Sequence, residues 1–424
     1  MISYSDGKLK LDYYKASVFL MGLFFIYSYV GLSPFAEADF DLQLSDTGGG
    51  NFLRQFVFVL LFSLTFICFR KLGEKHDLYK IGGYIFLLFW CLASVLWAEV
   101  PGVSIRRTVL LFITSSVVFM LVSIIDKEDL LRCLAKVYLG MLVVSIVSIP
   151  LVNGAVHSNP EMFDSGLVGN WKGIYSHKNI AGPATAFGIL LFSYMYMKTK
   201  NLIWGFAIFC GLVFIYFTKS KTSLALIIPS MVFGIAMMKA SSNFTIRKVL
   251  SLMLFIFIVL SIILQGFIVD GFVELLDDPE AFTGRATIWN IMYYALKDNF
   301  LLGLGYGSVW RVGDNMLITE YAFGWVDWVF TLTQGHNSYL DILLSIGVVG
   351  FGISIFVLFI QPFYKMIVFG SNSSFSFVYY SLFFFFVFHS FLETNLLYAD
   401  KGRWLFFLLI YMVVMLKSRE KAGE

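Results

Sequence analysis

The chain has 424 residues, of which 58% are hydrophobic and only 14% are charged, and its mean hydropathy is +0.79. Soluble domains carry about 25% charged residues, so the composition excludes a soluble globular protein and predicts an integral membrane protein. The apolar runs are continuous rather than alternating, which excludes a membrane β-barrel, whereas the net charge of +3 excludes little because membrane proteins sort their charges by side.

About twelve apolar runs are each close to the length that a helix needs to cross a bilayer. The first begins at Ala16, and its flank at residues 6–15 is mixed in charge with no cleavage pattern after it, so we interpret it as a retained span. Only residues 218–221 separate the seventh and eighth runs, which predicts a tight hairpin. The predicted spans are residues 16–34, 53–69, 81–98, 107–125, 136–152, 181–197, 201–217, 222–239, 248–269, 337–362, 376–392 and 403–416.

The distribution of basic residues predicts the orientation. Loops rich in Lys and Arg stay on the cytoplasmic side of a membrane. If the N-terminus lies inside, most of the 31 Lys and Arg residues fall in cytoplasmic loops. We therefore predict that both termini are cytoplasmic and that the acidic segment 37–46 and the long segment 270–336 lie outside.

A smaller set of basic residues falls on the outer side, most of them next to span ends. The positive-inside tendency disfavours them there, so a bound anion is one explanation. Phosphate fits, because arginine binds it through two parallel charge-assisted hydrogen bonds; the alternative is snorkelling to lipid headgroups. The set comprises Arg54, Arg106, Arg107, Lys172, Lys178, Lys219, Lys221, Arg285, Lys297, Arg311, Lys401 and Arg403.

Segment 270–336 is the largest polar island of the chain. Apolar residues recur at helical spacing over 286–296, which predicts an amphipathic helix along the membrane interface. Thr283 is its predicted N-cap, and Arg285 would lie in its first turn, where the helix dipole also favours anions. The GLGYG motif at 303–307 lacks the βαβ context of a dinucleotide site and predicts tight turns with close backbone approach instead.

His336 and Asn337 come directly before an apolar span. A neutral imidazole at this place could accept a proton from a hydroxyl near pH 7, and the alternative is a hydrogen-bonded structural histidine. Within the spans, Asp341 and His389 are the main ionisable residues, and both lie near the predicted outer ends. The lack of such groups near the midplane argues against an ion-coupled transporter.

Several sequence blocks occur in the same order as in a known family. The chain resembles the O-antigen ligase and polymerase superfamily of bacterial membrane glycosyltransferases, and most of all its exopolysaccharide-production polymerases. The resemblance implies an all-α polytopic membrane fold of the GT-C-like type, with about twelve transmembrane helices and a large periplasmic loop that contains short amphipathic helices. It divides the chain into spans 1–9 (1–269), the periplasmic loop (270–336) and spans 10–12 with a short cytoplasmic tail (337–424). The blocks are SVLWAEVPGVSIRRT (94–108), GIYSHKNIAGP (173–183), TKSKTSLAL (218–226), TGRATIW (283–289), GLGYG (303–307) and GHNSYLDILLSIGVVG (335–350).

The resemblance also implies the site residues. Arg285 matches the arginine of the family's GR block and His336 the histidine of its last motif, and we expect both to be catalytic. Lys221 stands where many relatives carry arginine, which keeps the charge but removes the bidentate fork. The other expected pyrophosphate-binding residues are Arg106, Arg107, His177, Lys178, Asn179 and Asn337.

The implied reaction moves an oligosaccharide from undecaprenyl pyrophosphate to an acceptor hydroxyl, with inversion, at the periplasmic face of the inner membrane. No metal or other cofactor is expected; Asp277 and Asp278 are adjacent in a loop, which is a poor metal-binding pattern. Polymerisation of repeat units is the primary hypothesis, and ligation to lipid A core stays open. A flippase or transporter is the alternative from another class. Expected partners are the lipid-linked glycan, an acceptor glycan or lipid A core, membrane lipids and a chain-length regulator, without nucleic acid.

Overall fold

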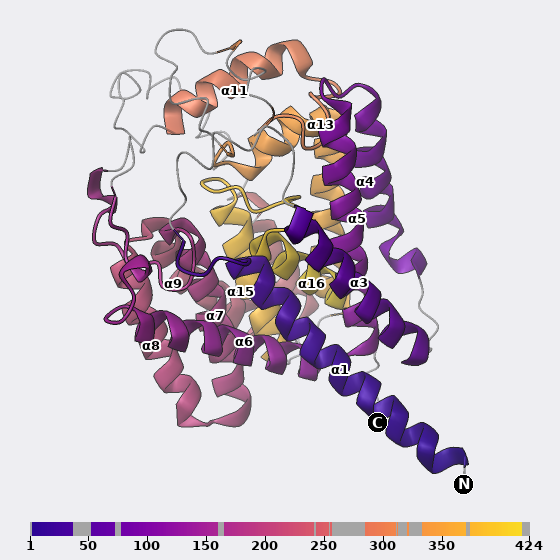
Figure 1. Ribbon diagram of the computed structural model, residues 1–424, viewed down its shortest axis with the longest axis vertical. Coiled ribbons are helices and arrows are strands. Elements are labelled where there is room, and N and C mark those ends of the chain that lie inside the picture. Colours follow the sequence, from indigo (N-terminus) through magenta and orange to yellow (C-terminus); the bar gives the residue numbers. More distant parts are fainter. Residues whose placement is uncertain are drawn as a thin grey trace.

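The computed structural model describes residues 2–36, 52–72, 78–159, 165–240, 243–253, 255–256, 285–310, 312, 320–321, 333–369 and 374–417. Apart from one isolated bridge between Val156 and Trp171, these residues form helices and connecting loops (Figure 1), which confirms the predicted all-α class. The helices are α1 (Ile2–Val30), α3 (Phe52–Leu72), η1 (Leu78–Ile81), α4 (Gly82–Ala93), η2 (Ser94–Leu96), α5 (Pro101–Ile124), α6 (Lys127–Ser148), η3 (Asn153–Ala155), η4 (Ser165–Leu167), α7 (Lys178–Thr199), α8 (Leu202–Thr218), α9 (Lys221–Lys239), α11 (Arg285–Asn299), α13 (Ser338–Ile355), the π-helix η8 (Phe356–Ile360), α14 (Gln361–Phe369), α15 (Ser374–His389) and α16 (Gly402–Lys417).

Seven helical stretches in the described part are long and apolar enough to cross a membrane, and α8 and α15 are shorter apolar helices. The protein is therefore a polytopic membrane protein, as predicted. Helices cover most of every predicted span except 248–269, of which only the beginning is described. The count of about twelve transmembrane helices stays a prediction.

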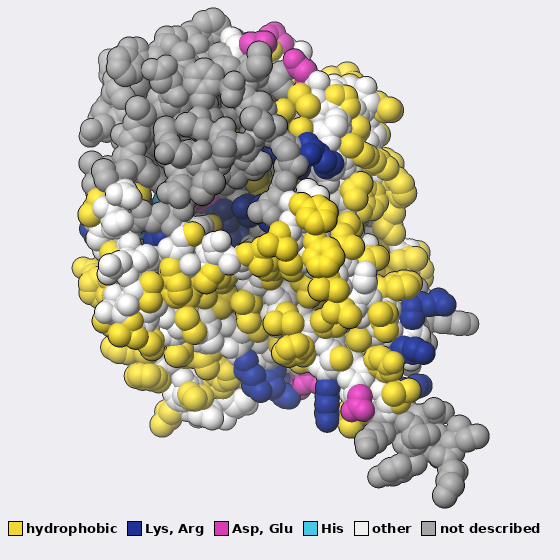
Figure 2. Space-filling model, viewed as in Figure 1, with side chains coloured by type: hydrophobic (Ala, Val, Ile, Leu, Met, Phe, Trp, Pro, Cys, Tyr) yellow, Lys and Arg dark blue, Asp and Glu magenta, His cyan; other side chains and the backbone are white. Residues whose placement is uncertain are grey.

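The centre of the bundle is formed by α7, α15 and α16, whose side chains are buried along most of their length. By contrast, α3 and α8 expose large apolar side chains such as Phe56 and Phe209. A hydrophobic band crosses the middle of the molecule, with Lys and Arg above and below it (Figure 2). This is the pattern of a helix bundle whose outer face meets lipid.

The bundle has two different ends. Both termini lie at one end, and α11 lies at the other (Figure 1). At the terminal end, Lys198 on α7 pairs with Glu128 on α6 at 2.5 Å. At the opposite end, Arg54 at the start of α3 pairs with Asp400, just before α16, at 2.7 Å. We call the second end the α11 end.

The predicted hairpin between α8 and α9 is confirmed as a short connection, because only Lys219 and Ser220 separate the two helices. Lys219 has a left-handed φ of 51° and ends α8. The two helices nevertheless diverge, and α9 packs chiefly on α15. A Cβ added at Gly234 would lie 2.7 Å from the carbonyl oxygen of Phe377, so the missing side chain allows this close approach.

The predicted helix after residue 285 is confirmed as α11, whereas Thr283 and Gly284 lie outside the described residues. Its apolar face is covered by protein, since Ile288, Met292 and Ala295 form a buried cluster with Trp310 and Leu344. That this helix lies along the membrane interface stays a prediction. On other sides of the helix, the side chains of Tyr293 and Tyr294 are exposed.

The GLGYG segment makes the close approaches that its glycines predicted. Gly303, Gly305 and Gly307 all have positive φ values. A Cβ on Gly305 would lie 2.4 Å from that of Ala98. A Cβ on Gly303 would clash with the backbone of α13 at Gly347, where α13 is itself broken by a non-helical residue. These contacts fasten the segment between α5 and α13 at the α11 end.

Candidate active site

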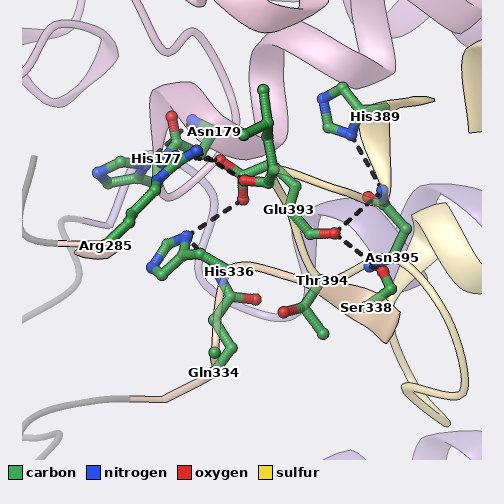
Figure 3. Close-up of polar contacts among 12 residues, drawn as sticks. His177, Asn179, Arg285, Gln334, His336, Ser338, His389, Glu393, Thr394 and Asn395 are labelled. Atoms are coloured by element: carbon green, nitrogen blue, oxygen red, sulfur yellow. Dashed lines mark hydrogen bonds and ion pairs between the residues drawn. The ribbon is translucent and has the colours of Figure 1, made fainter. Parts of the chain in front are cut away.

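A buried carboxylate forms the centre of the α11 end. Glu393 lies in the loop between α15 and α16, and its side chain is 5% exposed. Arg285, the first residue of α11, donates to Glu393 Oε1 at 2.7 Å and to the carbonyl of Leu392 at 2.6 Å. His336 Nδ1 lies 3.4 Å from Glu393 Oε2 (Figure 3). Arg403 Nη1 lies 3.8 Å from the same oxygen. Residues from three distant segments thus converge on one carboxylate.

Charge complementarity keeps this carboxylate ionised. Burial alone raises the pKa of Glu393, because the low-dielectric interior disfavours the charged form. Arg285, His336 and Arg403 together outweigh this effect and hold the pKa of Glu393 below its usual range. Two guanidinium groups and an imidazole surround one negative charge, so the cluster keeps a positive excess that suits a polyanion.

The backbone around His336 is fixed by a second carboxylate. His336 has a left-handed φ of 52°, which is uncommon for a residue other than glycine. Asp341, buried in the first turn of α13, accepts from the amide of Gly335 at 3.1 Å and from Trp310 Nε1 at 2.7 Å. Thr394 also donates to Asp341. Asp341 therefore ties the segment before His336 to the loop that carries Glu393.

A third set of hydrogen bonds joins this loop to α9 and α13. Asn395 Nδ2 donates to His389 Nδ1 at 3.0 Å, so that His389 Nε2 carries the proton and donates to Ser223 at 3.1 Å. Ser338 donates to the carbonyl of Glu393 and accepts from the amide of Asn395. The loop is thus held from both sides, which orients Glu393 before any substrate binds.

The predicted HKN block begins α7 at the same end. His177 caps this helix, because its Nδ1 accepts from the amide of Asn179 at 3.0 Å. The carbonyl of Asn179 accepts from Arg403 at 3.3 Å, which joins the start of α7 to the Glu393 cluster. Lys178 directly follows the cap, and Lys221 is exposed at the start of α9. Asn337 caps α13 through the amides of Tyr339 and Leu340, so its side chain supports the helix.

Arg106 and Arg107 lie elsewhere, in a cavity between α3, α5, α13 and residues 396–401. Arg107 Nη1 donates to the carbonyls of Gly307 at 2.5 Å and Trp310 at 2.6 Å, so this arginine fastens the GLGYG segment to α5. Another outer cation, Lys172, is buried and donates to the carbonyl of Ala36 at 3.1 Å. The predicted cations therefore form one group near Glu393 and another in this cavity. Arg107 and Lys172 have structural roles, because they donate to backbone carbonyls.

Sequence reasoning found Arg285 and His336 but missed Glu393, their common partner. The available signal was an acidic residue in the short FLETNLLYADKGR segment between two apolar spans. Nothing in the sequence says that it faces residues 57 and 108 positions away. Among the described residues, no group of three or more His, Cys, Asp or Glu side chains could hold a metal ion.

Residues 206–355, from within α8 to the end of α13, match the family model described as O-antigen ligase. Over this segment the chain is similar to the O-antigen ligase/polymerase superfamily. The matched segment contains Lys221, Arg285 and His336, whereas Glu393 and Arg403 lie beyond it. A comparison with curated proteins finds no match.

This similarity supports a membrane enzyme of the glycosyltransferase type, with ligase- or polymerase-type glycan transfer. The Glu393 cluster agrees with such an activity, because two arginines and a histidine meet at one carboxylate at one end of the helix bundle.

Proposed function

We propose that this enzyme transfers oligosaccharide repeat units from undecaprenyl pyrophosphate to an acceptor glycan at the periplasmic face of the bacterial inner membrane, as an exopolysaccharide or O-antigen polymerase does. The observation that carries the proposal is the convergence of Arg285, His336 and Arg403 on buried Glu393 at the α11 end. The superfamily match supports the reaction class.

The proposed orientation follows the bundle. Both termini lie at the end opposite α11 (Figure 1). With both termini in the cytoplasm, the Glu393 cluster faces the periplasm, as does the proposed loop 270–336. Lipid-linked glycans would then reach the cluster from the outer leaflet.

The proposed reaction is a direct displacement at the anomeric carbon. An acceptor hydroxyl oxygen forms the new bond to that carbon, and the bond from the carbon to the pyrophosphate oxygen breaks. The electron pair leaves with undecaprenyl pyrophosphate, and the hydroxyl proton passes to His336 Nε2. Attack opposite the leaving group inverts the anomeric configuration.

His336 is arranged for the role of proton acceptor. Its Nδ1 faces Glu393 Oε2, so the carboxylate orients the ring and stabilises the imidazolium that forms during transfer. The side chain of His336 is 23% exposed, whereas that of Glu393 is 5% exposed. The imidazole can therefore meet an acceptor hydroxyl while the carboxylate stays covered by protein.

The leaving pyrophosphate needs positive charge more than it needs a proton. Arg285 lies at the N-terminus of α11, and Lys178 and Lys221 lie at the N-termini of α7 and α9, where helix dipoles also favour anions. We propose that these cations bind the donor pyrophosphate and stabilise its developing charge. They supply the role that a divalent metal has in other transferases, and the reaction is proposed to be metal-independent.

Ligation to lipid A core is the second candidate, and the family description as O-antigen ligase favours it. The two reactions share the donor and the chemistry, and they differ in the acceptor. A chain-length regulator would be a partner only in polymerisation.

Product analysis with purified protein tests the proposal. Full-length enzyme in lipid nanodiscs is incubated with an undecaprenyl-pyrophosphate oligosaccharide, with and without lipid A core, and the glycans are sized. A ladder of repeat units without lipid A core supports polymerase, and a product formed only with lipid A core supports ligase. If neither mixture yields a longer glycan while the protein remains folded, glycan transfer by this site is refuted.

A further inference from the structure

A second cationic site lies apart from Glu393. The cavity between α3, α5, α13 and residues 396–401 has a volume of about 170 Å³. Four basic side chains line it, and two carboxylates accompany them. The basic residues are Arg54, Arg106, Arg107 and Lys401, and the carboxylates are Asp341 and Asp400.

Both carboxylates of the cavity are occupied by protein donors. Asp400 pairs with Arg54 at 2.7 Å. Asp341 accepts from Trp310, Gly335 and Thr394. Among the described residues that line the cavity, basic side chains are more numerous than carboxylates, which suits a ligand with negative charge.

The cavity and the Glu393 cluster share one loop and meet near His336. Residues 392–393 contact Arg285, whereas residues 396–401 line the cavity. Asp341 lines the cavity and also binds the amide of Gly335, directly before His336. Asp341 thus connects the cavity with the segment that carries the proposed proton acceptor.

The residues around the cavity suit a lipid-borne anion. Leu53 and Phe56 flank Arg54 on α3, and both are more than half exposed. On α5, Ile105 and Val109 beside Arg106 are also exposed and apolar. A chain attached to an anion among these cations would find an apolar surface that leads into the bilayer.

We propose that this cavity binds a phosphate group of the acceptor substrate, while the Arg285 side binds the donor pyrophosphate. The inference rests on the proposed glycan transfer. The acceptor phosphate has the same chemistry in both reactions. It belongs to a second pyrophosphate-linked glycan in polymerisation and to a phosphorylated lipid A core in ligation. In either case His336 meets the acceptor hydroxyl between the two anions.

Steady-state kinetics with distinguishable substrates test the inference. The donor is an undecaprenyl-pyrophosphate oligosaccharide whose non-reducing end is blocked, so that it cannot accept. The acceptors are the unblocked undecaprenyl-pyrophosphate oligosaccharide, phosphorylated lipid A core, and each of these glycans without phosphate. The double variant Arg106→Gln/Lys401→Gln is compared with wild type and with Lys297→Gln, which changes an exposed cation on α11 outside the cavity.

The double variant should raise the KM for the phosphorylated acceptor about tenfold or more, because charge-assisted hydrogen bonds to its phosphate are lost. The KM for the donor should change less than about twofold, because the donor pyrophosphate is proposed to bind on the Arg285 side and not in the cavity. The phosphate-free acceptors should show no difference between variant and wild type. Lys401→Gln alone, which retains every arginine, should shift the KM in the same direction by less. Whichever phosphorylated acceptor shows the effect identifies the source.

An equal rise in donor KM, or an equal rise with phosphate-free acceptors, would overturn the assignment of the cavity to the acceptor phosphate. So would an unchanged KM for both phosphorylated acceptors in an active variant. A wild-type enzyme that transfers to none of the acceptors would refute the proposed function itself, and the inference with it.

Discussion

Replacing Glu393 by glutamine tests whether this carboxylate organises the site. The substitution keeps the shape and an oxygen that can accept from Arg285, but it removes the negative charge that Arg285, His336 and Arg403 share. Removing one partner of a buried ion pair costs about 3–5 kcal/mol. We expect the lower end, because the hydrogen bond at 2.7 Å can persist.

Turnover should fall further than the loss of folded protein explains. A carboxylate that orients a histidine typically contributes on the order of 10- to 100-fold to activity, and Glu393→Gln should lose that factor in kcat. Glycan transfer measures turnover, and tryptophan fluorescence on heating measures stability. Glu99→Gln, an exposed carboxylate before α5, is the matched control and should behave like wild type.

The pH dependence of stability gives an independent check. The pKa of Glu393 is lowered in the folded protein. The ionised carboxylate therefore contributes fully to the free energy of unfolding above the ordinary glutamate pKa of about 4.3, and this contribution is lost as the pH falls below that value. The difference in unfolding free energy between wild type and Glu393→Gln should therefore stay constant between about pH 8 and pH 5 and shrink below about pH 4. Wild-type turnover and stability in Glu393→Gln would refute the central role of this carboxylate.

Three further substitutions probe the site and its support. Arg285→Ala should abolish product while the protein stays in the membrane at normal levels, and product at wild-type yield would remove Arg285 from the mechanism. For His336→Ala we expect a loss on the order of 10²–10⁴ in kcat, and unchanged turnover would reduce the histidine to a structural residue. Gly305→Ala should lower stability by about 1–3 kcal/mol, because φ is +93° and Ala98 occupies the Cβ position. Gly102→Ala on α5 meets nothing within 4 Å and should be neutral or stabilising; equal unfolding temperatures for the two variants would contradict the argument.

Local physics explains which parts of the fold were predictable from the sequence. A bilayer requires a continuous apolar run of a fixed length, so helices appear where the runs are. The glycines of GLGYG predicted close approach because only glycine tolerates positive φ at no cost, and Gly303, Gly305 and Gly307 all adopt it. Arg285 and His336 lie in polar blocks that resemble a known family, and both meet at one carboxylate.

The unpredicted features depend on contacts between distant segments. Glu393 binds a residue 108 positions away, and Arg107 binds carbonyls 200 and 203 positions away. The apolar face of α11 was correctly found by its periodicity, yet periodicity does not say whether lipid or protein covers it. The cations could be gathered on one side of the membrane from the sequence, but their division into two groups follows from how α3, α5, α7 and α9 pack.

Transfer at the periplasmic face requires the Glu393 cluster to lie on the side of the membrane away from the cytoplasm. Single cysteines can test this in intact cells with a membrane-impermeant maleimide, at Lys297 on α11 and at Lys200 after α7, both of which are exposed. We predict that Lys297→Cys is labelled in intact cells, whereas Lys200→Cys is labelled only after the membrane is opened. The reverse pattern would place Arg285 and His336 in the cytoplasm and contradict the proposed transfer at the periplasmic face.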